Sequence, residues 1–501
     1  MDLSYILKRP VQPAPTVTPS VPRYHVYCGH GKAETQRVTL GSVKGHGDEA
    51  TNSYFEHSNA KRINTDSVFA SALRKQYPEL ELVVVEEFQC NLLAFAGAGH
   101  ATFHPIHDKG EFPSSLEVTV YLPPARRMNG NKGRLGEAVI FGKFLYQWQG
   151  EEFVVYLVDG RDGSEAYPQV KNYYILTANI HKAEELVLAT GSWATDLHDE
   201  VWVYDQGDFF KDRELWKSSQ KATWDAVILD PEMKKQLIND HISFFESRQT
   251  YKNLGVPWKR GLIYHGPPGN GKTISIKATM HMLADRTPTI PTVYVRSLES
   301  WMGPQYSLHI IFEKAREFAP CYLVFEDIDS LVTPDVRSYF LNEVDGLKEN
   351  DGIFIIASTN HLENLDPGIS KRPSRFDRKY YFPDPNLDQR EAYCHFWQKK
   401  LNSNKDIEFP DKLCRAIAEI TDNFSFAYIQ EAFVAALLAI AGRSKMKPAN
   451  AGCAAAWVLV DDNQSSGETP DEDDLDRLEL WIEIRKQVKI LREGMEDKAA
   501  M

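Results

Sequence analysis

A glycine-rich loop is the segment of this sequence whose residue types and spacing carry the plainest chemistry. Its eight residues are Gly266, Pro267, Pro268, Gly269, Asn270, Gly271, Lys272 and Thr273. Glycines allow consecutive backbone N–H groups to curl around phosphate oxygens, because no side chain blocks the approach. Lys272 supplies a positive charge for the phosphates, and Thr273 offers a hydroxyl to Mg²⁺. An apolar strand at 261–265 precedes the loop and a helical stretch follows it, an order that a chance glycine-rich turn would lack.

An apolar run that ends in acidic residues is the second segment whose residue types suggest chemistry. Four apolar residues at 322–325 are followed by Glu326 and Asp327. Beside a phosphate loop, one carboxylate can hold Mg²⁺ through its water shell, and the next can orient or deprotonate an attacking water. We therefore predict that Glu326 is the metal carboxylate and Asp327 the base. The alternative is a solvated strand end, which is the common explanation for an acidic cluster without a phosphate loop upstream.

Two further segments with candidate site residues follow in the chain. The strand at 352–358 leads to Asn360, whose amide can hold the attacking water or the γ-phosphate. Arg372 and Arg375 come next, three residues apart, and guanidinium groups pair with phosphate oxygens and stabilise charge in the transition state. Either arginine alone would be interpreted as a surface charge. The order of the glycine-rich loop, the acidic pair, the asparagine and the arginines along the chain favours a role in phosphoryl chemistry.

Between the second and third strands of this region lies the triplet Trp301, Met302 and Gly303. A large flat side chain can contact any polypeptide without sequence preference, and glycine lets a loop move. The alternative is that Trp301 packs against its own domain.

These residues require a fold that brings separate strand ends together. From Trp224 onward, apolar strands alternate with helical stretches, which predicts an α/β fold with a parallel sheet and helices on both faces. Upstream, β-branched and aromatic runs predict an α+β domain. The predicted organisation, in chain order, is a proline-rich tail at 1–23, an N-terminal α+β domain at 24–218 for a substrate or partner, a large subdomain at 219–385, a helical lid at 386–495 with an acidic insertion at about 443–471, and a tail at 496–501.

The second half of the chain resembles the AAA family of ATPases. The resemblance runs from about Trp224 to the last helix, and its motifs are GPPGNGKT, LVFEDID, ASTN, LDPGISKRPSRFDR and FSFAYIQEA. It implies ATP as the nucleotide, with Mg²⁺, and a homo-hexameric ring with one ATP between each pair of subunits. It also implies that Arg372 and Arg375 act in trans as arginine fingers and that Asn360 senses the γ-phosphate. The Trp301 triplet is similar to the first pore loop of AAA protein translocases.

The sequence departs from the family pattern at two places. Most members end the acidic strand in Asp then Glu, whereas here Glu326 precedes Asp327, so the expected base is one methylene shorter. This pair, with WKRGLIYHGPPG, is similar to the mitochondrial group that assembles the Rieske iron–sulfur protein. That group is membrane-anchored, and since no anchor is seen here its function is not carried over. Phe426 stands where many members carry a glycine in the lid.

Composition narrows the classes of function. The net charge of −13 disfavours an obligate nucleic-acid coat, because neutralising phosphates needs a basic face. The six cysteines form no C-x-x-C pair, and no apolar run reaches the length of about 18 residues that spans a bilayer. We expect a cytoplasmic or nuclear protein that does not enter a membrane. Three hypotheses remain: an ATP-driven remodeller of a protein client, a nucleotide switch with weak hydrolysis, and a nucleic-acid motor. The acidic charge and the tryptophan of the candidate pore loop favour the first of these over the third.

Overall fold

The computed structural model divides the chain into two compact units, Met1–Asp196 and Leu197–Met501, which are described separately. The ranges that it describes are 65–106, 115–123, 132–159, 171–345, 348–372, 375–404, 407–446 and 475–499. The predicted proline-rich tail and nearly all of the predicted acidic insertion lie outside these ranges.

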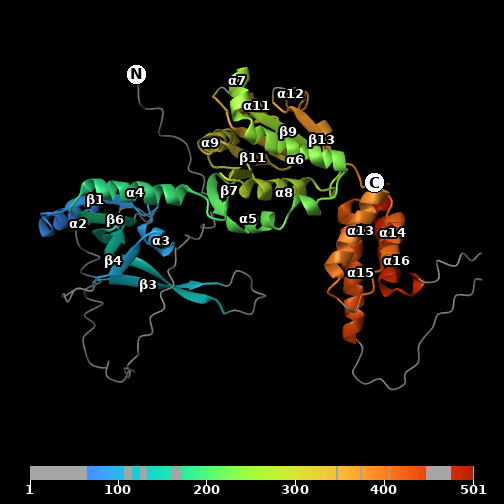
Figure 1. Cartoon of the computed structure of the whole chain (residues 1–501), viewed down its shortest axis with the longest axis horizontal. Helices are drawn as coiled ribbons and strands as arrows, with labels where there is room; N and C mark the ends of the chain where they lie inside the picture. The colour runs from blue at the N-terminus through green and yellow to red at the C-terminus, as the bar shows by residue number, and fades with distance from the viewer. Residues whose placement is uncertain are drawn as a thin grey trace, which may run out of the picture. The chain divides into compact units, whose positions relative to one another are not determined.

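The first unit is an antiparallel sheet of six strands with helices on both faces (Figure 1). Its strands follow the order β1-β6-β5-β4-β2, and β3 pairs with the early part of β4. The elements are α2 (Thr65–Gln76), β1 (Glu81–Glu86), α3 (Leu92–Gly97), β2 (Thr102–Pro105), β3 (Ser115–Leu122), β4 (Arg134–Trp148), β5 (Glu151–Asp159), β6 (Lys171–Thr177) and α4 (Ile180–Thr195).

Both faces of β6 are buried, because successive side chains of a strand point to opposite sides of the sheet. Tyr173 and Ile175 pack in one cluster with residues of α3 and α4. Tyr174 and Leu176 pack in a second cluster with residues of α2. The sequence therefore predicts this α+β arrangement correctly in kind, with one helix layer on each side of the central strands.

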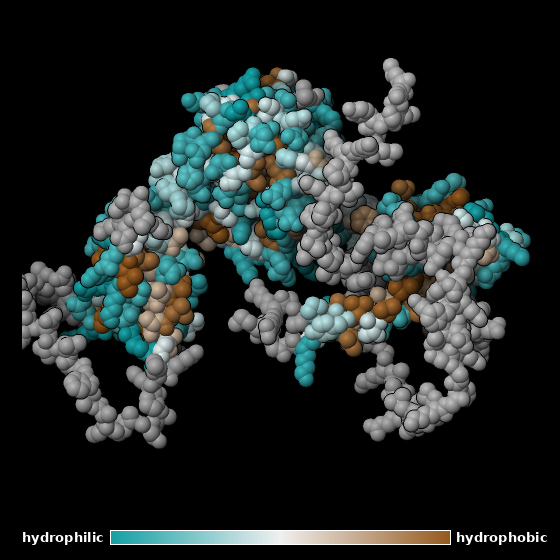
Figure 2. Space-filling model, turned by 180° about the vertical axis from the view of Figure 1, so that it is seen from behind, coloured by the Kyte–Doolittle hydropathy of each residue, from teal (hydrophilic) through white to brown (hydrophobic). Residues whose placement is uncertain are grey.

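The ribbon formed by β3 and residues 134–140 of β4 projects beyond the main sheet. The pairing of β4 with β5 begins only at Phe141, so this stretch of β4 pairs with β3 alone among the described residues. Figure 2 shows hydrophobic residues along the ribbon, and the exposed apolar side chains are Leu116, Val118, Tyr121 and Leu135. The ribbon thus offers apolar surface to solvent.

The second unit is built on a seven-stranded sheet of order β13-β9-β12-β11-β10-β7-β8. All neighbouring strands are parallel except β7 and β8, which form an antiparallel hairpin. Its elements through the last strand are β7 (Val201–Asp205), β8 (Asp208–Asp212), α5 (Arg213–Gln220), η3 (Trp224–Ala226), α6 (Pro231–Glu246), α7 (Arg248–Leu254), β9 (Arg260–His265), α8 (Lys272–Ala284), β10 (Thr292–Val295), α9 (Pro304–Glu317), β11 (Cys321–Phe325), α10 (Ile328–Leu331), α11 (Arg337–Asp345), β12 (Ile353–Thr359), η4 (Leu362–Asn364), α12 (Pro367–Ser370) and β13 (Arg378–Tyr381).

This sheet is sealed by helices on both faces, which explains why its central strands are continuous apolar runs. Leu323 and Phe325 of β11 join a cluster with α9 and α11, whereas Tyr322 and Val324 join a cluster with α6 and α8. The parallel sheet with flanking helices and an N-terminal antiparallel domain confirms the predicted fold class.

The boundary between the two units falls earlier than the sequence predicts. Residues 197–218, which we assigned to the N-terminal domain, belong to the second unit. The reason is that β7 pairs in parallel with β10, from Val293 opposite Trp202 to Val295 opposite Tyr204. A strand's residue content indicates that it is a strand, but it does not indicate which distant strand is its partner.

The helices after β13 fall in the range predicted for the lid, and we keep that name for them. They are α13 (Leu387–Leu401), α14 (Asp411–Ile420), α15 (Phe426–Met446), the short η5 (Leu475–Arg477) and α16 (Glu479–Ala499). Three apolar residues of α16, Trp481, Ile484 and Val488, are buried against the other helices of the lid. Because α16 continues to Ala499, the predicted tail at 496–501 is largely helical.

One helix, α15, is long and apolar enough over Phe426–Arg443 to cross a membrane by length and composition alone. Its residues Ile429, Phe433 and Ile440 are buried in the core of the lid. A core helix that packs in this way meets the same criterion, so the match is weak support for a membrane span.

Candidate active site

Three adjacent strands place the predicted site residues that follow them at one edge of the sheet. The glycine-rich loop follows β9, Asn360 follows β12, and Glu326 follows β11. These strands are neighbours in the order β9-β12-β11, with Thr359 opposite His265 and Phe325 opposite Ala357. In a parallel sheet the carboxyl ends lie together, and ligands bind beyond them. The structure thus brings the loop, the amide and the acids to the same edge.

Two glycines of the loop sit where no other residue would fit without rearrangement. At Gly266 the φ angle is +138°, and a Cβ would lie 2.3 Å from the carbonyl oxygen of Phe382. At Gly269 the φ angle is +82°, and a Cβ would lie 2.6 Å from the Cβ of Ala427 in α15. The amide of Ala427 also donates to the Gly269 carbonyl at 3.3 Å. The loop therefore needs glycine for its own curvature and for its contact with the lid.

Lys272 is held inside the curve of the loop. Its side chain is largely buried, and Nζ donates to the carbonyl oxygens of Gly266 at 2.7 Å and Pro267 at 2.8 Å. Burial lowers the pKa of the ammonium, while Asp327 and Asp329 act in the opposite direction. Both carbonyls are neutral acceptors, and a phosphate oxygen would be a stronger acceptor for the same cation. The side chain is therefore already in position to meet an anion.

The acidic pair differs sharply in environment. Glu326 Oε2 accepts a hydrogen bond from the Tyr294 hydroxyl at 2.5 Å, whereas its Oε1 is buried without a hydrogen-bond partner among the described residues. Asp327 is exposed, and its φ of +49° lies in the left-handed region. A buried carboxylate oxygen without a donor is costly unless a ligand satisfies it. Glu326 Oε1 and the exposed Thr273 hydroxyl are oxygen ligands of the kind that the predicted Mg²⁺ site requires.

Tyr294 is a candidate site residue that the sequence analysis missed. It lies on β10, which neighbours β11, and it fixes one oxygen of the carboxylate that we expect to face the metal. A tyrosine within an apolar strand gives no signal of this role, because the same pattern describes an ordinary core residue. A third acid, Asp329, accepts from Thr359 at 2.6 Å and joins the ends of β11 and β12.

The two arginines are not equivalent. Arg375 is buried and donates twice to the Asp345 carboxylate, at 2.8 and 2.5 Å, and once to the carbonyl oxygen of Gly368 at 2.6 Å. The predicted finger in trans is therefore engaged within its own chain in this structure. Arg372 keeps 60% of its side chain exposed and lies 3.6 Å from Asp345. Of the two, Arg372 is the guanidinium available to another molecule.

Trp301 lies on the loop between β10 and α9, and 91% of it is exposed. This exposure answers the alternative that the ring packs against its own domain. Met302 beside it is also exposed, and Gly303 has a φ of +89°. The predicted triplet is therefore a projecting tip with an apolar surface.

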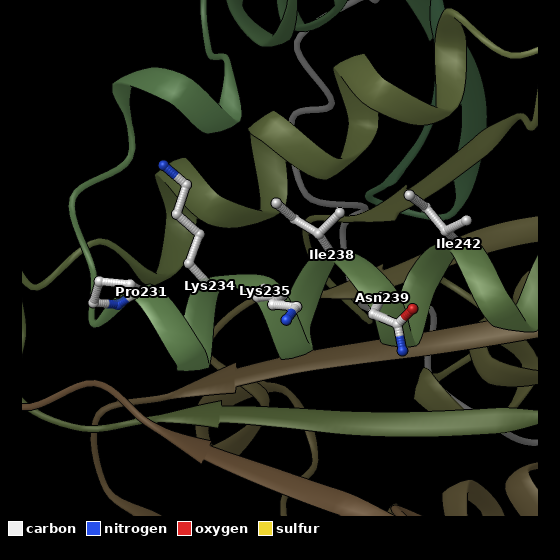
Figure 3. Close-up of a pocket in the computed structure, with 6 residues that line it drawn as sticks. All are labelled: Pro231, Lys234, Lys235, Ile238, Asn239 and Ile242. Carbon is white, nitrogen blue, oxygen red and sulfur yellow. The ribbon is translucent and has the colours of Figure 1, made fainter.

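A shallow hollow on α6 contains none of the predicted site residues. All six lining residues come from that one helix: Pro231, Lys234, Lys235, Ile238, Asn239 and Ile242 (Figure 3). Lys234 donates to the carbonyl of Val227. A single helix face without converging polar groups has no features of a catalytic site.

The nucleotide-binding interpretation is supported by similarity to known proteins. Residues 262–384 match the family described as "ATPase family associated with various cellular activities (AAA)". This segment contains the glycine-rich loop, the acidic pair, Asn360 and both arginines. The chain therefore carries an ATP-binding AAA ATPase domain, and the resemblance to this family is confirmed for that segment.

Curated relatives are AAA-type ATPases that are matched over part of their length. The "ATPase family gene 2 protein" of Saccharomyces cerevisiae is 29% identical over 247 residues, which are 45% of this chain and 30% of the relative. The "ATPase histone chaperone YTA7" of the same yeast is 30% identical over 180 residues, 33% of this chain and 13% of the relative. A "Putative cell division cycle ATPase" of Plasmodium falciparum is 30% identical over 220 residues, 42% and 17% respectively.

The chain thus spans less than a third of the length of these relatives. They give no support for the predicted similarity to the Rieske-assembly group.

Replacing Tyr294 with phenylalanine should weaken the use of Mg²⁺ without weakening nucleotide binding itself. The change leaves Glu326 Oε2 without its donor, and loss of such a supporting contact typically lowers metal affinity by about 10- to 100-fold. The measurement is a Mg²⁺ titration of the binding of a non-hydrolysable ATP analogue. Tyr264→Phe is the matched control, because that buried hydroxyl has no hydrogen-bond partner among the described residues. Equal Mg²⁺ affinity in parent and Tyr294→Phe would contradict the assignment.

Replacing each arginine with alanine should separate a structural from a surface role. Arg375→Ala should lower the free energy of unfolding by about 2–3 kcal/mol, because Asp345 and Gly368 lose their donors. Arg372→Ala should change it by less than about 0.5 kcal/mol. Thermal unfolding of both variants gives the comparison, and similar losses in the two would refute the distinction.

The ion pair of Arg375 with Asp345 makes the stability of the fold depend on pH. The Arg375 hydrogen bond lowers the pKa of the Asp345 carboxyl in the folded chain. The contribution of this ion pair to the free energy of unfolding is therefore complete above the usual pKa of a carboxyl group. It is lost as the pH falls through the lowered pKa of Asp345. The stability gap between parent and Arg375→Ala should narrow in acid.

Proposed function

We propose that this chain, whose residues 262–384 form an AAA ATPase domain, hydrolyses ATP to remodel or unfold a protein client as a ring of its own copies. The observation that carries the proposal beyond ATP binding is Trp301, which presents an exposed ring at the same sheet edge as the phosphate loop. An exposed aromatic ring can contact an extended polypeptide without sequence preference.

The chemistry is divided among residues in fixed positions. Lys272 and the loop amides bind the phosphates, while Glu326 and Thr273 would hold Mg²⁺, which supplies charge neutralisation on the phosphate oxygens. Asp327 is exposed beside this carboxylate and is the candidate to accept a proton from the attacking water. Asn360, at the end of the strand between β9 and β11, can orient that water or read the γ-phosphate.

A ring is proposed because one of the two arginines remains exposed and could serve a neighbouring copy. Arg375 is committed to Asp345, whereas Arg372 keeps 60% of its side chain exposed. In phosphoryl transfer an arginine supplied by a neighbouring molecule can raise the rate by about 10³–10⁵. Arg372 of one copy would thus serve the nucleotide of the next, and the hexamer is the arrangement that the AAA resemblance favours.

A nucleotide switch with weak hydrolysis is the second candidate. It is favoured by the acidic pair itself, since the base is an aspartate and the longer Glu326 is tied to Tyr294. Measurable turnover coupled to client unfolding separates the first candidate from the second.

The ring can be tested by mixing two inactive variants. Arg372→Ala should bind ATP but lose most of its turnover, and Lys272→Ala should lose phosphate binding while keeping Arg372. Mixed assemblies should regain part of the activity, because a Lys272→Ala copy lends its arginine to an Arg372→Ala neighbour. ATP hydrolysis is measured for each variant alone and for the mixture. If the mixture is no more active than the sum of its parts, the arginine does not act between copies.

The client role can be tested at Trp301. Trp301→Ala should unfold a fluorescent protein with an unstructured tail several-fold more slowly per ATP hydrolysed, since the ring that would grip the tail is gone. Tyr339→Ala is the control, because it removes another exposed ring of the same unit, on α11. Trp301→Phe should keep part of the activity. Unfolding at the parent yield per ATP by Trp301→Ala would exclude this use of the loop.

A further inference from the structure

The loop that carries Trp301 is fixed to a hairpin outside the segment matched to the AAA family. Residues Asp205 to Asp208 form the turn between β7 and β8, and they precede the matched segment by more than fifty residues. The backbone at Arg296 continues the pairing of β10 with β7, because its amide donates to the carbonyl of Tyr204 at 3.0 Å. The loop therefore begins as an extension of the sheet and not as a free segment.

Asp205 is the centre of the contact between turn and loop. Its Oδ1 accepts from the Ser297 hydroxyl at 2.8 Å, and its Oδ2 lies 3.6 Å from Nη1 of Arg296. The Ser297 hydroxyl in turn accepts from the amide of Gln206 at 3.1 Å. The other side of the Arg296 guanidinium lies 3.4 Å from Asp212. Two consecutive loop residues are thus joined to the hairpin by charged and neutral hydrogen bonds.

The hairpin also reaches the residue before the tip. Gly207 has a φ of +97°, and a Cβ there would lie 3.1 Å from the Cβ of Ser300. On the inner side, Leu298 is buried in the core of the sheet. The loop is therefore held at 296, 297 and 298 and is closely approached at 300, immediately before the exposed ring.

Only the tip is left to project. The amide of Gly303 donates to the carbonyl of Ser300 at 3.1 Å, and the Ser300 hydroxyl donates to the carbonyl of Gly303 at 3.0 Å. This closes a turn whose two central residues are Trp301 and Met302. Ser307 of α9 donates to the same Gly303 carbonyl at 3.3 Å, which ties the far end of the turn to the helix.

From this geometry we infer that Asp205 is a positioning residue for the substrate-gripping loop, so that the β7–β8 turn holds the Trp301 tip against the load of a polypeptide chain. The inference rests on the function proposed above for Trp301. A side chain on an unanchored loop would have to be ordered at each contact, whereas a supported tip meets its partner already ordered. The hairpin would thus be the part of this chain that makes a general AAA sheet suitable for gripping.

Amide hydrogen exchange across residues 297–303 tests the positioning directly. Asp205→Ala removes the acceptor for Ser297 and one ion pair of Arg296, and exchange at 299–303 should become at least about tenfold faster. Exchange in the phosphate loop at 266–273 should stay as in the parent. Asp208→Ala is the matched control, because it removes an exposed carboxylate from the same turn.

Ser297→Ala is the second variant, and it guards against misfolding of the hairpin. It breaks the contact from the loop side and leaves β7 and β8 unchanged, so it should reproduce the faster exchange of Asp205→Ala. The increase in exchange of the double variant should be smaller than the two single increases combined, because both single variants remove the same Asp205–Ser297 hydrogen bond. Exchange at 299–303 that stays at the parent rate in both single variants would overturn the inference.

Client unfolding separates this inference from the function on which it rests. If the tip is gripping, Asp205→Ala and Ser297→Ala should both unfold less client per ATP hydrolysed, whereas Asp208→Ala should not. Faster exchange with unchanged client unfolding would overturn the claim that the anchor serves a load. If Trp301→Ala also unfolds client at the parent yield, the proposed function fails, while the exchange result still decides whether Asp205 positions the loop.

Discussion

Parallel pairing of β9, β12, β11 and β10 is the constraint on which the rest of the site depends. Each of these strands ends at the same edge, and each end leads into a segment with its own chemistry: the phosphate loop, Asn360, the acidic pair and the Trp301 loop. The register is maintained because both faces of the sheet are buried under helices, so that a slip by one residue would exchange the two hydrophobic clusters. The geometry of the site is thus a consequence of core packing.

The strand β10 connects the acidic pair with the Trp301 loop at this edge. Through Tyr294 it contacts the carboxylate of Glu326, and one residue beyond its end Arg296 begins the loop held by Asp205. A change at the carboxylate and a load on the tip would therefore meet within a few residues of one short strand. Coupling of this kind needs an element with two arrangements, and β10 with its hairpin is the element to examine.

The sequence predicted the parts of the site that are local in the chain. The glycine loop, its preceding strand and its following helix are contiguous, so one motif defines all three, and four of the seven strands of the sheet are evident as apolar runs. The failures were long-range. The pairing of β7 with β10 joins residues about ninety positions apart, and Asp345, thirty residues before Arg375, decides that arginine's role. Neither partner has a local signature, because charge and β-propensity identify a residue's needs and not the group that meets them.

Steady-state ATP hydrolysis by the full chain, beside Asp327→Asn and over a range of chain concentrations, tests the central claim most directly. The account predicts that the parent hydrolyses ATP with a rate per chain that rises with concentration, because an arginine of a second copy completes the site. Asp327→Asn should bind ATP with the parent's affinity and hydrolyse it at least about a hundredfold more slowly. A parent no faster than this variant, or a rate per chain that is constant down to the dilute monomer, would contradict the account.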